Sequence, residues 1–519
     1  MKKIFVSLFA CAAMLTSCDM DTPAPGVLDD QTAINSITEA KQFRNYIYSM
    51  MRGCTSGSWV YNTELQMDQY LGLSTNGNRG GDLASGDITT SSSFAKSAFN
   101  GMYSRIANVN YYLEKTSALA NLDLSEEQAL SLQRYVGEAK FARAYFYFYL
   151  MDHFCQTYDA SKGDVAALGM PIVITYNPTG DTSKYPGRST MNELLNLIKN
   201  DLADAYTALK AYEDAGFTEN TVAGAPYLSS YTVLAMQARV ALVTSDYTTA
   251  IEKAKAVIAN ENYQLAVGAD YVQMWADANV DELIFAPFVD QSEASSIGSF
   301  CEGWNYWWSN TTQTDYLPTA ETLLNFLDID EDGNIAPNDY RFAAYFKYTD
   351  INVQGGTTKA YTMNKFPGNP ALNKDTNLYL NMPKPFRLSE QYLIWAEAAA
   401  MTNKPAEACE ALNAILAARR LPGSYTNLSI SGTELVEFIR AERSRELLGE
   451  GFRLSDLRRW KVAWKRDAEY LFNPTINESF VIADVKTQYE ANDYRYLWPI
   501  PADEMEINPQ LAGQQNPGY

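Results

Sequence analysis

The strongest constraint on the fold of this 519-residue chain is a helix-pair pattern that occurs twice. The first copy spans residues 231–260 and breaks at Thr244–Asp246, and the second spans 389–419 and breaks at Asn403–Pro405. The small residues that recur on the helical segments are Ala235, Ala238, Ala250, Ala254, Ala396, Ala399, Ala400 and Ala408. Small residues let two short antiparallel helices approach closely, as tetratricopeptide-type hairpins require. The pattern therefore predicts a scaffold of stacked helical hairpins.

Apolar residues recur at helical spacing in five further segments. These are residues 38–51, 98–119, 125–152, 191–209 and 433–448. Two long stretches, 55–97 and 264–385, are instead rich in Gly, Asn, Ser, Thr and aromatic residues and show weak periodicity. Loops of this length inside a compact protein usually serve a function. We therefore expect a mostly α fold in which a tetratricopeptide-like helical hairpin scaffold carries long inserted loops, in a single domain over residues 34–519.

The charge balance excludes several classes of function. The chain has 62 acidic and 41 basic side chains, a formal net charge of -21. Phosphate binding needs a basic face, so nucleic acid is not expected as a partner. His153 is the single histidine, which leaves little room for histidine-based triads or histidine-rich metal sites.

The first residues have the order of an export signal. Lys2 and Lys3 precede an apolar run, Ile4–Leu15, that is too short to span a membrane. The run ends in Leu-Thr-Ser-Cys18, which resembles the bacterial lipobox. We expect residues 1–17 to be a lipoprotein signal peptide, Cys18 to carry lipid such as palmitate, and residues 18–33 to form a tether. The alternative is a secreted protein with an incidental cysteine.

Four other cysteines follow Cys18: Cys54, Cys155, Cys301 and Cys409. Their spacing matches no metal motif, and they are too sparse for a disulfide framework. Buried free thiols are the favoured interpretation, and one disulfide is the alternative.

Two stretches near the C-terminus indicate a family. They are residues 439–460, which begin Ile-Arg-Ala-Glu-Arg, and residues 496–501, which read Tyr-Leu-Trp-Pro-Ile-Pro. Together with 103–108 and 138–148 they resemble the SusD/RagB family of surface lipoproteins, and the acidic residues after Cys18 resemble the family's surface-export signal. The resemblance implies a SusD-like α–α superhelix anchored by lipid in the outer membrane and exposed at the cell surface. It also implies a SusC-like TonB-dependent transporter as partner, and a glycan or, in the RagB branch, a peptide as ligand.

The C-terminal stretch also has a structural interpretation. Glu442, Arg443 and Glu446 stand at helical spacings that allow ion pairs with Arg445, Arg453 and Asp456. Glu446 and Glu450 could be taken for an acid/base pair, but nothing nearby marks either as a positioned acid. The favoured interpretation is a charged brace, meaning a set of ion pairs with a structural role. No catalytic residue is expected.

A tryptophan-rich segment is the strongest ligand-site candidate. Sugar rings have apolar C–H faces ringed by hydroxyl groups, so a binder needs flat aromatic side chains with hydrogen-bonding groups at their edges. The segment offers Trp304, Asn305, Tyr306, Trp307 and Trp308, with Tyr316 close behind. The resemblance implies that the early region contributes as well, and the candidates there are Trp59, Tyr61, Asp68 and Asn76. The alternative is a loop packed onto the core by its aromatic residues.

A calcium-loop pattern begins at Asp328. Asp330, Asp332 and Asn334 follow at the expected offsets, Asp339 stands where a glutamate is usual, and residues 323–327 would be the incoming helix. A solvated acidic turn is the alternative. No cofactor is required, and structural calcium is the one metal the sequence suggests.

The favoured function is capture of an oligosaccharide at the cell surface and its delivery to the partner transporter, with this protein as the lid. A RagB-type peptide-uptake protein is the main alternative, and a surface glycoside hydrolase or a pure scaffold are the others. Acidic pairs occur by chance among 62 acidic residues, so they do not favour an enzyme.

Overall fold

The computed structural model describes residues 34–73, 81–293, 295–296, 302–306, 311–329, 335–353, 356–372, 379–466 and 486–519. Cys18 and the segments expected to be a signal peptide and a tether lie outside these residues. The domain boundaries expected there stay predictions.

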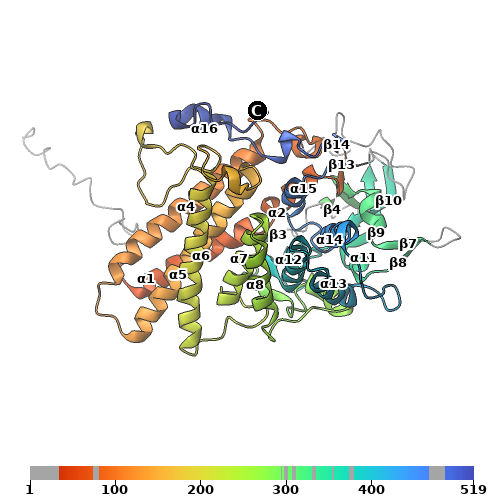
Figure 1. Ribbon diagram of the computed structural model, residues 1–519, viewed down its shortest axis with the longest axis horizontal. Helices are drawn as coiled ribbons and strands as arrows, with labels where there is room; N and C mark the ends of the chain where they lie inside the picture. Colours follow the sequence, from red (N-terminus) through yellow and green to blue (C-terminus); the bar gives the residue numbers. More distant parts are fainter. Residues whose placement is uncertain are drawn as a thin grey trace, which may run out of the picture.

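Long helices occupy one side of the molecule and most of the strands lie at the opposite end (Figure 1). The long helices are α1 (Ile37–Cys54), α4 (Ser93–Leu119), α5 (Glu126–Phe154) and α6 (Met191–Asp214). α5 packs between α4 and α6. It begins with a capping box, in which the Ser125 and Gln128 side chains accept from each other's backbone N–H groups. These helices confirm four of the predicted segments.

The two predicted helical hairpins are present. They are α7 (Ser230–Val243) with α8 (Tyr247–Ile258), and α12 (Leu388–Met401) with α13 (Pro405–Arg419). Each turn contains a left-handed residue, Ser245 at φ 60° and Asn403 at φ 59°. Asp246 caps α8, and Pro405 starts α13, where its missing N–H costs no hydrogen bond. The breaks read from the sequence therefore coincide with the turns of the structure.

The alanines of the pattern are buried where the hairpins meet. Ala238 of α7, Ala254 of α8 and Ala399 of α12 belong to one apolar cluster and have at most 2% of their surface exposed. α12 packs against both α8 and α13, and α14 (Gly432–Glu446) packs against α12. Close approach of these helices depends on the small side chains, as the sequence predicts.

The remaining helices are short. They are α2 (Ser58–Gln66), α3 (Gly81–Ser85), α9 (Ala269–Met274), α10 (Ala320–Leu324), α11 (Tyr340–Tyr345), α15 (Arg453–Trp460) and α16 (Ala502–Ile507). Among the described residues, none of the helices is both long enough and apolar enough to cross a membrane.

A four-stranded sheet has the order β10-β9-β5-β4. Its strands are β4 (Glu302–Tyr306), β5 (Thr311–Thr314), β9 (Phe346–Val353) and β10 (Gly356–Met363). β5 and β9 run parallel, and the other neighbours in the sheet are antiparallel. β9 and β10 form a hairpin in which Phe346 lies opposite Met363.

Five two-stranded sheets complete the described strands. They pair β1 (Tyr70–Gly72) with β6 (Tyr316–Pro318), β2 (Leu283–Phe285) with β12 (Phe386–Arg387), β3 (Ser295–Ser296) with β11 (Leu380–Asn381), β7 (Leu327–Ile329) with β8 (Ile335–Pro337), and β13 (Trp464–Lys465) with β14 (Gln488–Tyr489). The stretches expected as loops therefore contain short helices and nearly all of the strands. Most of these strands have two to five residues and are too short for an alternating pattern to be recognised. β10 has eight residues, but its burial does not alternate regularly.

Two large apolar cores lie on either side of the helical hairpins. One is formed by α1, α4, α5, α6 and α7, and the other lies beneath the short strands and includes Tyr70, Tyr271, Trp275 and Tyr345. Cys54, Cys155 and Cys409 are buried free thiols, which confirms the favoured interpretation for these three. Cys301 lies outside the described residues.

Candidate functional site

The two regions expected to form the ligand site meet in the structure. β1 belongs to the early region, and it pairs antiparallel with β6, which follows the tryptophan-rich segment. The pairing sets Gly72 opposite Tyr316. Thr319 extends the contact, since its N–H donates to the carbonyl of Gln69 and its hydroxyl to that of Asp68, 251 positions away. We call this contact the β1–β6 joint.

The tryptophan-rich segment begins on an edge strand. Trp304, Asn305 and Tyr306 lie in β4, which pairs with β5 at the end of the four-stranded sheet. In the described part of the chain, β4 has a strand neighbour on one side only. The register shifts within β4, which is typical of a bulge that redirects side chains. Trp307 and Trp308 lie outside the described residues, and the role of all five residues stays a prediction.

The early aromatic candidates lie on α2. The Trp59 ring contacts Tyr149 of α5 at 5.8 Å between centroids, and the guanidinium of Arg105 lies 4.5 Å from its centre. Gly101 makes room for the ring, because a Cβ there would lie 2.5 Å from it. Tyr61 is half-buried and packs against the core that lies beneath the short strands. Both residues thus pack against the scaffold, and a ligand role for them stays a prediction.

Asp68 joins the early region to the C-terminal part of the chain. Its two carboxylate oxygens accept from Arg453 at 2.8 and 2.5 Å. On α2, just before Asp68, Glu64 accepts from the backbone N–H groups of Gly451 and Arg453 at 2.8 and 3.3 Å. Burial raises the pKa of Glu64 to about 7, because the hydrogen bonds from these N–H groups lower the pKa by less than burial raises it. The start of α15 therefore positions the early region.

Two further predicted residues have different surroundings. Tyr316 lies in β6 with 5% of its surface exposed, and it belongs to the core beneath the short strands. Asn76 lies outside the described residues. Contact of either residue with a ligand stays a prediction.

The acidic residues that an enzyme could use form a buried ion-pair network. Glu446 contacts Arg341, Arg387 and Arg419 at 3.0, 2.8 and 2.9 Å. Burial by itself raises the pKa of Glu446, but the three arginines more than offset this and hold the pKa well below its usual range. Glu450 pairs with Arg387 at 2.6 Å. Both carboxylates are buried and engaged by cations from other segments, so the network is a brace that holds those segments together.

The predicted partners of this brace are correct in part. Glu442 pairs with Arg445 at 2.6 Å, and Arg443 pairs with Asp456 at 2.7 Å. Arg453, which was also expected in the brace, pairs with Asp68 instead. The reason is that Arg453 opens a new helix, α15, whose first turn faces α2.

The two ends of the calcium pattern lie in the described residues. Asp328 is on β7 and accepts from the amide of Asn338. Asp339 is fully buried, and its carboxylate pairs with Arg341 at 2.6 Å and with Arg420 at 3.5 Å. In the described residues, no group of three or more His, Cys, Asp or Glu side chains is placed to hold a metal ion. Asp330, Asp332 and Asn334 lie outside these residues, and calcium stays a prediction.

The incoming helix expected over residues 323–327 is wrong. α10 ends at Leu324, and β7 begins at Leu327 and pairs with β8. Phe326 explains the change, because its buried ring packs at 5.7 Å from Tyr345 and 5.4 Å from Phe346. This packing ends the helix one turn early and turns the chain into a strand.

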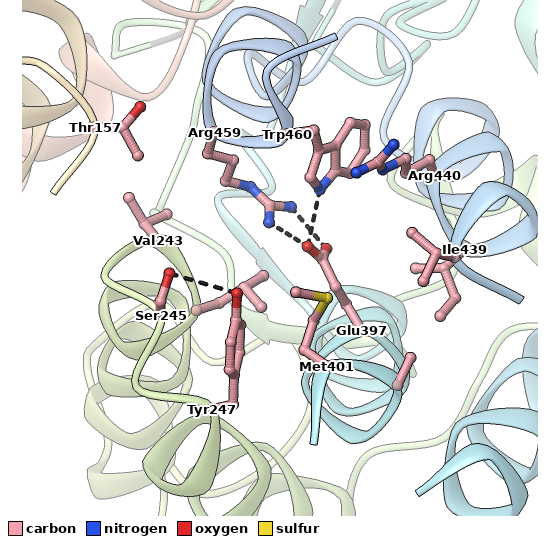
Figure 2. Close-up of a pocket in the computed structure, with 13 residues that line it drawn as sticks. Thr157, Val243, Ser245, Tyr247, Glu397, Met401, Ile439, Arg440, Arg459 and Trp460 are labelled. Carbon is pink, nitrogen blue, oxygen red and sulfur yellow. Dashed lines mark hydrogen bonds and ion pairs between the residues drawn. The ribbon is translucent and has the colours of Figure 1, made fainter. Parts of the chain in front are cut away.

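A pocket of about 180 Å³ lies between α7, α12, α14 and α15, and no sequence pattern predicts it. Figure 2 shows Glu397 pointing toward Arg459 and Trp460, both of which donate to its carboxylate. Arg440 lies with its guanidinium 5.4 Å from the centre of the Trp460 ring, and its buried Nε has no partner among the described residues. The lining residues come from separate helices, so no local motif could indicate the pocket.

Comparison with family models covers both halves of the chain. A model described as "SusD family" matches residues 296–519, and one described as "Starch-binding associating with outer membrane" matches residues 28–233. SusD-like protein P38 of Formosa agariphila is 25% identical over 501 residues, which cover 87% of this chain and 89% of that protein. SusD-like protein P25 of the same organism is 23% identical over 492 residues, which cover 85% and 83%.

Solved structures share the fold. A SusD superfamily protein from Bacteroides thetaiotaomicron is 25% identical with a TM-score of 0.73, covering 93% of this chain and 100% of that one. A SusD-like carbohydrate binding protein from Bacteroides vulgatus is 18% identical with a TM-score of 0.69, covering 93% and 98%. The mostly α fold is thereby confirmed. With both halves matched by family models and 87% of the chain by a SusD-like protein, this protein belongs to the SusD/RagB family.

Proposed function

We propose that this protein captures an oligosaccharide at the cell surface and delivers it to a SusC-like TonB-dependent transporter in the outer membrane, over which it acts as a lid. Its family binds nutrients, and one of its family models is described as starch-binding and associating with the outer membrane. The observation that carries the proposal is the β1–β6 joint, which brings the early region beside the chain that follows Trp304–Tyr306. A bipartite ligand surface is what the resemblance implies.

The chemistry of the tryptophan-rich segment favours a sugar. An edge strand keeps backbone N–H and C=O groups available, and its aromatic residues supply flat surfaces for the C–H faces of sugar rings. Stacking together with edge hydrogen bonds gives affinity without any bond being broken. We therefore infer that the protein is a binding protein and not an enzyme. The burial of Glu446 among three arginines, which keeps its carboxylate away from a ligand, supports this inference.

Anchoring at the cell surface follows from the same proposal. Lipid on Cys18 and a tether over residues 18–33 hold the domain near a transporter without a spanning helix. Replacing Cys18 with serine in the full chain should release the protein from the outer-membrane fraction. Retention of the Cys18→Ser protein in that fraction would contradict lipid anchoring.

The proposal is tested by titration of the mature domain with a panel of plant, host and microbial glycans. Calorimetry is the readout, because removing tryptophans changes the fluorescence. Trp304→Ala, Trp307→Ala and Trp308→Ala should each weaken binding about 10-fold, the loss expected for one aromatic stacking contact. Tyr46→Ala is the matched control, since Tyr46 is an aromatic residue of α1 with 48% of its surface exposed. It should leave the affinity unchanged.

Three outcomes contradict the proposal. Unchanged affinity in all three tryptophan variants would remove the segment from the site. Binding of peptide pools with no response to any glycan would assign the protein to the RagB-type alternative. Shortened glycan products after incubation would show an enzyme.

A further inference from the structure

A second cleft, of about 680 Å³, opens on the helical scaffold. The described residues that line it come from the segment after α5, the α7–α8 turn, the end of α15 and residues 491–497. None of them comes from β1, β4, β5 or β6, which carry the ligand site proposed above. The cleft is therefore a separate feature that the proposed function does not use.

Aromatic rings form the walls of this cleft and are held in place by their neighbours. Tyr158 donates its hydroxyl to the Oδ1 of Asn192 at 2.9 Å, which fixes its ring. Tyr494 has 40% of its surface exposed and contacts Tyr519 edge-on, at 4.9 Å between centroids. Gly518, at φ 95°, lies so close to the Tyr494 ring that a Cβ there would stand 2.4 Å from it. The backbone thus supports a tyrosine ring that is still open to a ligand.

Polar groups with free hydrogen-bonding capacity line the same cleft. The side chains of Gln156, Thr157 and Asn492 form no hydrogen bond with the described residues. Arg458 is 9% exposed, and its Nε is buried without a partner among these residues, while its Nη2 donates to Asp152 at 3.0 Å. A buried donor without a partner is costly, so it is a natural place for a ligand oxygen.

The cleft also carries positive charge on an acidic protein. Lys162 is exposed and pairs only loosely with Asp159, at 3.9 Å, and Lys461 is exposed at the left-handed end of α15. Asp159 accepts from the backbone N–H of Ser161. The other acidic residue of the lining is Asp493, which is engaged by Arg495 at 2.6 Å. Arg458 is paired with Asp152, so Lys162 and Lys461 share the one carboxylate of Asp159 and leave one basic group in excess. On a chain with a net charge of -21, this excess marks a place for an anionic group.

The pocket of Figure 2 continues the cleft. Thr157 and Ser245 line both of them, and Figure 2 shows these two residues on one side of the pocket, across from Arg459. The unpartnered Nε of Arg440 lies at the far end. The two hollows therefore share part of their walls.

We propose that this cleft is a second carbohydrate site, selective for an acidic saccharide. The tyrosines stack on sugar rings, Gln156 and Asn492 bind ring hydroxyls, and Lys162, Lys461 and Arg458 bind the carboxylate or sulfate. The inference rests on the proposed function only in its choice of carbohydrate as the ligand class. A purely neutral ligand would leave the basic groups of the cleft unused.

Hydrogen–deuterium exchange of the mature domain tests the proposal. The probes are three acidic tetrasaccharides, derived from polygalacturonate, alginate and chondroitin sulfate, with maltotetraose as the neutral comparison. At least one acidic probe should protect segments 156–162 and 491–497 from exchange, and maltotetraose should not. The Trp304→Ala variant should keep this protection, because Trp304 belongs to the first proposed site and not to this cleft. The variant therefore separates loss of binding at the first site from loss of binding at the cleft.

Substitutions in the cleft complete the test. Lys162→Gln combined with Lys461→Gln should weaken binding of the acidic probe 10-fold or more, as should Tyr494→Ala, while Tyr494→Phe should retain it. Lys41→Gln and Tyr46→Ala, on exposed positions of α1, are matched controls that should change nothing. The proposal is overturned by protection from none of the three acidic probes, by equal protection from maltotetraose, or by unchanged affinity in the cleft variants.

Discussion

At the level of single residues, buried charge is handled in two different ways. Glu446 is surrounded by three arginines, so it stays ionised in the interior. Glu64 is equally buried, but one of its oxygens has no partner among the described residues and the other accepts only backbone N–H groups. A buried carboxylate without a close cation of its own is destabilised, which makes Glu64 a pH-sensitive point of the fold.

The stability of the protein should fall as the pH rises through the range in which Glu64 ionises. The carboxyl titrates near 4.5 when the chain is unfolded and at about 7 in the folded protein, because burial raises its pKa. Between these values the folded state holds a proton that the unfolded state has released, so each increase in pH favours unfolding. The loss from this group is on the order of 3 kcal/mol by about pH 8.

Glu64→Gln isolates this effect from other titrating groups. The amide keeps an oxygen that can accept from Gly451, and it does not ionise. Urea unfolding from about pH 4.5 to 8 should show a smaller loss of stability in Glu64→Gln than in the natural chain. Glu410→Gln, at an exposed position of α13, is the matched control. Identical pH profiles for the natural and Glu64→Gln chains would show that Glu64 does not titrate as inferred.

Single residues also show which ion pairs can be predicted from the spacing of residues along the chain. Spacing along one helix predicted the pairing of Glu442 with Arg445, and the structure contains it. It could not predict that Arg341 and Arg387 contact Glu446, since they stand 105 and 59 positions away. The packing of helices brings such distant partners together, and the spacing of residues along one helix contains no information about it.

At the level of elements, the sequence predicts most of the long helices but not the strands. A hairpin such as α12–α13 repeats small residues at close-contact positions over many turns, and its break carries turn residues. β1, by contrast, has three residues, all buried, so it shows no alternation. The stretches expected as loops consequently hold most of the strands.

Enlarging one alanine at the hairpin contact should destabilise the scaffold. Ala399 of α12 is fully buried in the cluster shared by both hairpins, so Ala399→Leu forces the helices apart. The expected loss is about 1–3 kcal/mol of unfolding free energy, measured by urea unfolding. Ala406→Leu is the matched control, because Ala406 is exposed on α13 and should tolerate the change. Equal stability of the two variants would argue against close helix contact at Ala399.

At the level of the whole molecule, the proposed glycan site depends on a contact between distant parts of the chain. The β1–β6 joint connects the early region to the central strands, and Asp68 connects the same region to α15. Neither contact involves the two helical hairpins. The site can therefore loosen without unfolding of the scaffold.

Breaking the Asp68–Arg453 pair should loosen the early region selectively. Arg453→Met leaves a partly buried carboxylate unpaired, and Asp68→Asn combined with Arg453→Met removes the pair. A double-mutant cycle should give a coupling of about 1–2 kcal/mol. Hydrogen exchange in residues 58–73 should rise in Arg453→Met, while that of α12 and α13 stays unchanged. A coupling near zero, or faster exchange throughout the chain, would contradict this role.

The amino-acid sequence by itself determined the helical hairpin scaffold, the local ion pair of Glu442 with Arg445 and the family resemblance, because each is encoded in neighbouring residues through periodicity, spacing or motif. Only the tertiary structure decided that β1 pairs with β6, that Arg453 pairs with Asp68, and that a cleft opens between the segment after α5, the end of α15 and residues 491–497. These contacts join residues hundreds of positions apart. Their free energy comes from burying surfaces that exist only once the scaffold has folded, so no local pattern records them.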